Sequence, residues 1–112
     1  MITSGANGIG RRIAKTFLRG GTTVSVIEID KETGKKFDEI EFYYNEIADK
    51  TALDAFVSYL KQPVEYLINN ACIGRGGILS NYSYEDFEYI QRVGVTAPYY
   101  LTSLLLKTIY LP

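Results

Sequence analysis

The chain has 112 residues, of which 46% are hydrophobic and 22% charged, and this composition is typical of one globular domain with a modest core. Its formal net charge of −1 argues against nucleic acid and anionic membranes as partners. The sequence has no histidine, which excludes histidine-based acid–base chemistry and histidine metal ligands. One cysteine excludes an internal disulfide and suits a reducing compartment. Because no signal peptide or membrane-spanning apolar run is visible, we expect a cytoplasmic protein.

The first part of the chain alternates strand-like and helix-like patterns. Residues 1–3 read as the end of a strand, and apolar residues at helical spacing predict a helix over residues 8–18. Residues 22–29 are rich in β-branched side chains and predict a second strand. A short helix over residues 31–38 and a third strand over residues 41–44 are expected to follow.

The remaining part continues this alternation. Asp49 is expected to cap a helix, and an apolar run over residues 64–68 predicts a fourth, buried strand. Ser83 is expected to cap a long helix over residues 84–106. Pro98 lacks the N–H that would bond to the carbonyl of Gly94, so we expect a kink there. Alternating strands and helices indicate an α/β fold with a parallel sheet, in one domain over residues 1–112.

A glycine-rich turn opens the first helix, directly after the first strand. Such a turn lets an anion approach the main chain, and a helix N-terminus offers N–H groups and a positive dipole end. We therefore expect it to bind a pyrophosphate, although a turn that only connects a strand to a helix is the alternative. The candidate residues are Ser4, Gly5, Ala6, Asn7, Gly8, Ile9 and Gly10.

The spacing of this turn resembles the T-G-x-x-x-G-I-G pattern of the short-chain dehydrogenase/reductase family, with Ser4 in place of the family's first glycine. The common G-x-G-x-x-G fingerprint does not fit, because Ile13 stands where its third glycine would be. The resemblance implies a partial Rossmann fold with flanking helices. Its parallel sheet would have the strand order 3-2-1-4.

An acidic residue near the end of the second strand suits a ribose. Glu28 follows Gly10 by 18 residues, and a carboxylate there can accept both ribose hydroxyls and repel a 2′-phosphate. Asp30 is the second candidate for this role. Asn7 is neutral where NADP-dependent members of the family often have a basic residue. These residues favour NAD over NADP as the cofactor, although Glu28 could also be a solvated strand end.

The resemblance extends to three later segments. Glu46 and Ile47 match the family's Asp-Val, which contacts the adenine. The segment Asn69-Asn70-Ala71-Cys72 resembles the family's Asn-Asn-Ala-Gly, which lies beside the ribose, so Asn70, Ala71 and Cys72 join the candidate cofactor-binding residues. Gly94 stands where the family has a catalytic asparagine, and it could instead serve close packing or the kink.

The family's catalytic serine and Tyr-x-x-x-Lys pair are expected in the part of a family domain that the resemblance does not cover. No substitute for the pair is found, since no lysine has a tyrosine four residues before it. The resemblance covers the first half of a family domain, so the domain is expected to be truncated. We thus predict an NAD(H)-binding, oxidoreductase-like chain without catalytic residues or a metal site. An interaction or oligomerisation module with a relic nucleotide loop, or one part of a split oxidoreductase, are the alternatives. An open fourth strand and the apolar surface of the long helix predict a homo-oligomer.

Overall fold

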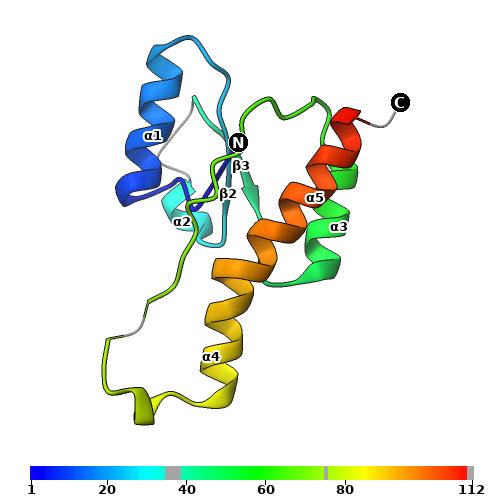
Figure 1. The fold of residues 1–112 in the computed structure, drawn as a ribbon. Helices are drawn as coiled ribbons and strands as arrows, with labels where there is room; N and C mark the ends of the chain where they lie inside the picture. The colour runs from blue at the N-terminus through cyan, green and yellow to red at the C-terminus, as the bar shows by residue number, and fades with distance from the viewer. Residues whose placement is uncertain (35–38, 75, 111–112) are drawn as a thin grey trace.

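The computed structural model describes residues 1–34, 39–74 and 76–110, and it has an α/β architecture (Figure 1). Three parallel strands form the sheet in the order β1-β2-β3, with bounds Ile2–Thr3, Ser25–Glu28 and Glu41–Tyr44. Ile2 lies opposite Val26 in the β1–β2 register. The predicted fold class, a parallel sheet with flanking helices, is therefore confirmed.

The predicted fourth strand is reduced to one isolated bridge. Ile68 pairs in parallel with Ile2, its N–H donates to the Met1 oxygen at 2.9 Å, and its oxygen accepts from the Thr3 N–H at 3.1 Å. The segment thus occupies the fourth position of the order 3-2-1-4, but β1 has only two residues to pair with it. The expectation that it is a buried strand is wrong, since the Tyr66 side chain is 59% exposed.

The helices begin and end close to the predicted positions, and Asp49 and Ser83 cap them as expected. The Asp49 carboxylate accepts from the Ala52 N–H at 3.2 Å, and the Ser83 hydroxyl accepts from the Asp86 N–H at 3.0 Å. The α-helices are α1 (Gly8–Arg19), α2 (Lys31–Gly34), α3 (Lys50–Tyr59), α4 (Tyr84–Gln91) and α5 (Ala97–Tyr110), with a 3₁₀ turn η1 (Leu79–Asn81). The expected second half of α2, residues 35–38, lies outside the described residues.

A π-helical turn, η2 (Arg92–Thr96), joins α4 to α5 at the site where the sequence predicts a kink. The Ala97 N–H donates to the Arg92 oxygen five residues earlier, and Pro98 follows with no N–H to donate. The predicted irregularity is therefore present as a wider turn of helix. The two helices follow one another without an intervening loop (Figure 1).

The sheet separates two apolar clusters. Successive residues of β2 point to opposite faces, so Val26 packs with Ala14 of α1, whereas Ile27 packs with residues of α3 and α5. Figure 1 shows α1 on one side of the sheet and α3 with α5 on the other. Leu101 and Leu105, which the sequence placed on an exposed apolar surface, are instead buried in the second of these clusters.

The helix α4 extends past the end of the sheet, together with the segment before it (Figure 1). The carboxyl ends of all three strands lie at this end of the sheet. Among the described residues, no helix is long and apolar enough to cross a membrane. The fold thus presents the first-strand turn, the strand ends and α4 on one side of the molecule.

Candidate functional site

A hollow of about 90 Å³ lies at the carboxyl ends of the strands. In parallel α/β sheets, ligands bind at this edge. The segments that line the hollow follow β1, β2 and β3 and the bridge at Ile68, and α4 closes it on one side. Six of the predicted cofactor-binding residues line it: Ser4, Glu28, Glu46, Ile47, Ala71 and Cys72.

The turn after β1 depends on glycine for two different reasons. Gly10 lies where α1 passes closest to β1, and a Cβ there would lie 2.4 Å from the Ser4 oxygen. Gly8 has a φ of +55°, in the left-handed region that favours glycine, and open space surrounds it. A turn of this shape leaves room for a ligand beside the start of α1, as the spacing of the motif predicts.

Ser4 occupies the position of the family's first glycine and adopts the conformation of a glycine. Its φ is +57°, the only positive value found for a non-glycine residue in the described ranges. A left-handed conformation costs an L-residue roughly 1–2 kcal/mol. The turn geometry is therefore retained in spite of the serine, with local strain at this position.

Asn70 connects the end of β1 to the neighbouring segment. Its side-chain amide donates to the oxygens of Ser4 at 3.0 Å and Thr3 at 3.3 Å. The main-chain N–H groups of Asn70 and Ala71 both donate to the hydroxyl of Thr3, at 3.0 and 2.9 Å. Because Thr3 is buried, these bonds fix the edge of the sheet next to the glycine turn.

The two candidate ribose-binding acids lie in different surroundings. Glu28 is only 9% exposed and lines the hollow, where its carboxylate accepts from the N–H groups of Ala6 at 3.4 Å and Ile29 at 3.0 Å. Asp30 instead accepts from the Glu32 N–H at 2.9 Å, at the start of α2, and is not among the lining residues. The geometry therefore favours Glu28 over Asp30.

Glu46 has a partner that sequence reasoning missed. The Tyr89 hydroxyl, from α4, donates to the Glu46 carboxylate at 2.9 Å, and the Ala48 N–H donates to the other carboxylate oxygen at 3.0 Å. Burial and the nearby carboxylate raise the pKa of Tyr89. In the sequence, Tyr89 stands out only by its helical spacing of four residues from Val93. The structure shows that Val93 is buried and also lines the hollow.

Two of the singled-out residues differ in their position relative to the hollow. Cys72 lines it, is exposed and carries a free thiol. Gly94 lies in η2, outside the residues that line the hollow, and a Cβ there would meet nothing within 4 Å. Close packing therefore does not account for this glycine.

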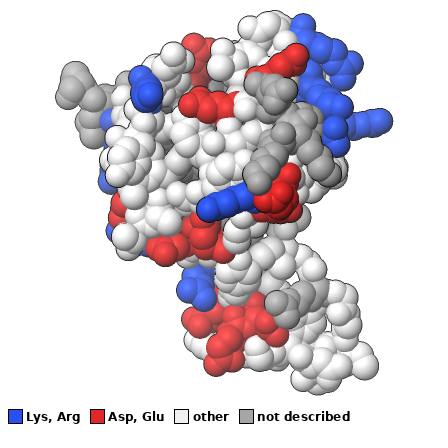
Figure 2. All heavy atoms as spheres, turned by 180° about the vertical axis from the view of Figure 1, so that it is seen from behind, with Lys and Arg blue, Asp and Glu red and all other residues white. Residues whose placement is uncertain are grey.

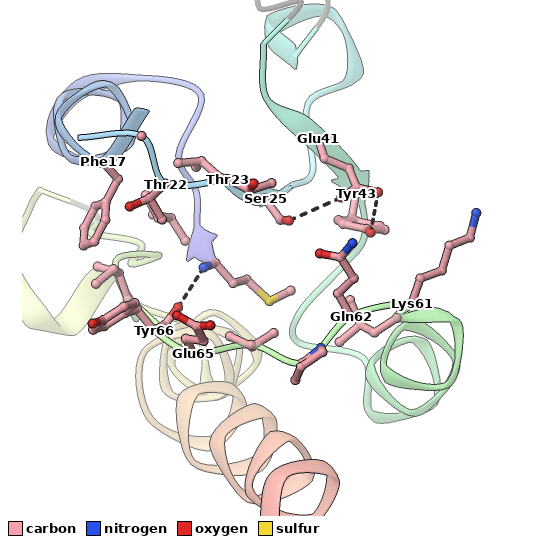
Figure 3. A pocket seen from close by; sticks show the side chains of 18 residues that line it. Phe17, Thr22, Thr23, Ser25, Glu41, Tyr43, Lys61, Gln62, Glu65 and Tyr66 are labelled. Atoms are coloured by element: carbon pink, nitrogen blue, oxygen red, sulfur yellow. Dashed lines mark hydrogen bonds between the residues drawn. The ribbon is translucent and has the colours of Figure 1, made fainter. Parts of the chain in front are cut away.

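A larger hollow of about 510 Å³ lies at the opposite, amino ends of the strands (Figure 3). The Met1 nitrogen donates there to the Tyr66 oxygen at 2.7 Å, and Glu41 accepts from the hydroxyls of Ser25 and Tyr43. This hollow contains none of the motif residues. We therefore assign the candidate site to the smaller hollow, because position and chemistry count for more than volume.

The charges near the glycine turn suit an anion. Figure 2 shows Lys and Arg side chains gathered along the edge that α1 forms, and Arg11 and Arg12 directly follow the turn. Acidic side chains gather on the part that contains α4 (Figure 2). Among the described residues, no cluster of three His, Cys, Asp or Glu side chains could hold a metal ion.

The family model of short chain dehydrogenases matches residues 1–110. A match over nearly the whole chain shows that the protein belongs to the short-chain dehydrogenase family. The parallel sheet, the glycine turn and the placement of Asn70 agree with this assignment.

Individual relatives support the same assignment. The chain is 29% identical to an uncharacterized oxidoreductase of Thermotoga maritima over 88% of this chain and 43% of the relative. It is 28% identical to a sepiapterin reductase of Chlorobaculum tepidum, over 94% of this chain and 50% of the relative. The chain therefore spans about half the length of the curated relatives that it matches.

Two solved structures are similar in both fold and sequence. An apo SCOR enzyme from Clostridium thermocellum has a TM-score of 0.82 and 38% identity, over 95% of this chain and 46% of that one. A 3-ketoacyl-(acyl-carrier-protein) reductase from Brucella melitensis, in complex with NADH, has a TM-score of 0.83 and 29% identity. That match covers 94% of this chain and 47% of the reductase.

Proposed function

We propose that the chain binds NAD(H) at the hollow beside the glycine turn, as the cofactor-binding half of a short-chain dehydrogenase. The contact between Glu28 and the Ala6 N–H is the observation that supports this most directly. It puts a buried carboxylate beside the turn that would hold the pyrophosphate. The related reductase from Brucella melitensis was solved with NADH.

In this proposal each segment has one role. The turn over residues 4–10 approaches the pyrophosphate, Glu28 accepts the ribose hydroxyls, and Asn70, Ala71 and Cys72 lie beside the ribose. Glu46 and Ile47 contact the adenine. The glycine turn fits such a group, because Gly8 leaves open space where the pyrophosphate would approach.

NAD is the preferred cofactor, since a 2′-phosphate would face the Glu28 carboxylate in a poorly solvated position. The test is a titration of the 112-residue chain with NAD, NADP and AMP, with thermal stability as the readout. Glu28→Gln should reduce the preference for NAD over NADP, because it removes the charge and keeps the shape. Glu41→Gln, at the opposite end of the sheet, is the matched control and should leave the preference for NAD over NADP unchanged.

Two results would count against this assignment. Equal or tighter binding of NADP by the unsubstituted chain would overturn the role of Glu28. Failure of all adenine nucleotides to bind would support the alternative, an interaction module with a relic glycine turn.

We expect the 112-residue chain alone to transfer no hydride. Reduction of a carbonyl needs a proton donor at the oxygen, and a positioned general acid contributes about a hundred- to ten-thousand-fold. This sequence has no histidine and no Tyr-x-x-x-Lys pair to serve as one. The assay follows NADH absorbance with a panel of ketones and secondary alcohols. Sustained turnover that Glu28→Lys abolishes would show that the chain is a complete enzyme.

A second candidate function is self-association, or completion by another chain in a split oxidoreductase. Exposed apolar side chains on α4, η2 and α5 favour it: Phe87 is 52% exposed, Val95 60% and Tyr99 73%. Covering such a surface is favourable. Sedimentation at micromolar concentration should show a dimer or higher oligomer, and a compact monomer would contradict this proposal.

A further inference from the structure

The contact between Tyr89 and Glu46 joins two parts of the chain that are 43 residues apart in sequence. Tyr89 belongs to α4, and Glu46 follows β3. Both residues line the hollow at the carboxyl ends of the strands. Glu28 lines the same hollow. The pair is therefore a wall of the candidate nucleotide site and not a remote surface contact.

Tyr89 and Glu46 offer a ligand hydrogen-bond acceptors and no free donor. The Tyr89 hydroxyl has one proton, which it donates to Glu46, so the phenol oxygen can only accept from a third group. The Glu46 carboxylate is an acceptor at both oxygens. A tyrosine hydroxyl keeps its proton at neutral pH, and burial and the carboxylate raise the pKa of Tyr89 further.

We infer that Tyr89 is a positioning residue that holds Glu46 in place to select adenine over hypoxanthine. This inference rests on the proposed nucleotide function of the same site. The C6 amino group of adenine is a donor and can pair with a wall of acceptors. Hypoxanthine carries a carbonyl oxygen at C6, which accepts only and would face the carboxylate unpaired.

Tyr89 determines the orientation of the acceptor. The Glu46 side chain has several rotatable bonds, and each hydrogen bond limits the rotamers that it can adopt. Tyr89 fixes one carboxylate oxygen and Ala48 the other, so the direction of the carboxylate is set before a nucleotide binds. Loss of the Tyr89 hydroxyl should therefore weaken discrimination at C6 more than overall binding.

The test compares the affinities of AMP and IMP, which share the ribose and phosphate, by isothermal titration on the unsubstituted chain and on Tyr89→Phe. The phenylalanine keeps the ring and removes the hydroxyl. The preference for AMP over IMP should fall by about three- to tenfold, the range expected for one hydrogen bond. Tyr84→Phe, at an exposed tyrosine of the same helix, is the control and should leave the preference unchanged.

A second variant keeps the test decisive if Tyr89→Phe folds poorly. Glu46→Gln replaces one acceptor oxygen with a donor amide, so IMP should gain affinity relative to AMP. An unchanged ratio in a folded Tyr89→Phe variant, with AMP still bound, would overturn the inference, and so would an unchanged ratio in Glu46→Gln. Failure of the unsubstituted chain to bind either nucleotide would instead overturn the proposed function of the whole site.

Discussion

The side-chain amide nitrogen of Asn70 lies 3.0 Å from the main-chain oxygen of Ser4 and donates a hydrogen bond to it. Gly10 completes this contact, because a Cβ at residue 10 would lie 2.4 Å from the same oxygen and 2.5 Å from the Asn70 nitrogen. The start of α1, the end of β1 and the segment after Ile68 thus meet where only a hydrogen atom fits.

Gly10→Ala should destabilise the protein, because the new methyl group forces backbone atoms apart. We expect the free energy of unfolding, measured by urea denaturation, to fall by about 1–3 kcal/mol. Gly94→Ala is the control, since a Cβ there meets nothing within 4 Å, and its stability should be unchanged or slightly higher. An equal loss in both variants would contradict the close approach at Gly10.

Thr3→Val should be costly although the two side chains have nearly the same shape. The Thr3 hydroxyl accepts from two main-chain N–H groups, those of Asn70 and Ala71, and valine would leave both without this partner. A loss of about 2 kcal/mol in the free energy of unfolding is expected. Thr3→Ser keeps the acceptor, so its free energy of unfolding should fall less. A serine variant that is less stable than the valine variant would contradict the prediction.

Ser4→Gly should stabilise the protein. The left-handed conformation at Ser4 costs a serine roughly 1–2 kcal/mol, whereas glycine avoids this cost but has more freedom in the unfolded chain. The expected net gain is up to about 1 kcal/mol in chemical denaturation. Ser58→Gly, within α3, is the opposite case and should lose about 0.5 kcal/mol. Stabilisation by both or by neither would argue against strain at Ser4.

The stability of the protein should fall at alkaline pH in part through Tyr43. Burial, with a hydrogen bond to Glu41, raises the pKa of Tyr43 to about 12 in the folded state from 10.0. Between pH 10 and 12 the unfolded chain therefore loses this proton while the folded chain retains it, so the free energy of unfolding decreases over that range.

Tyr43→Phe removes this titration, so its stability should decrease less between pH 10 and 12 than that of the unsubstituted chain. The measurement is urea denaturation at several pH values. Tyr44→Phe, at the more exposed neighbouring tyrosine, serves as the control and should follow the unsubstituted chain. Parallel curves for all three proteins would show that Tyr43 does not contribute.

Local chemistry accounts for most of what the sequence predicts correctly. Asp49 and Ser83 act as caps through partners three residues away. The glycine turn can be predicted because only glycine fits at certain of its positions, and this requirement is visible as a sequence motif. The second strand is shorter than predicted, Ser25–Glu28, because the Thr22 N–H donates to the Phe17 oxygen and belongs to the turn after α1. β-branched residues alone cannot reveal this competition.

Distant pairing accounts for what sequence reasoning missed. The segment around Ile68 has the composition of a buried strand, but the number of residues that pair depends on β1. Tyr89 belongs to the candidate site only because α4 passes over the segment after β3. Neither relationship leaves a periodic pattern in the sequence. The preference for Glu28 over Asp30, by contrast, already followed from the sequence, and the surroundings of the two carboxylates agree with it.

The π-helical turn η2 fixes the rotational phase between α4 and α5. Each residue of an α-helix advances the chain by about 100° around the axis, so one extra residue in a turn changes which side of α5 faces the sheet. Deleting one residue within η2 would favour a continuous α-helix. With α4 and Tyr89 held in place, α5 would then be rotated, and Leu101 and Leu105 would leave the core. A deletion within η2 is therefore expected to destabilise the fold more than a substitution of one of its exposed side chains.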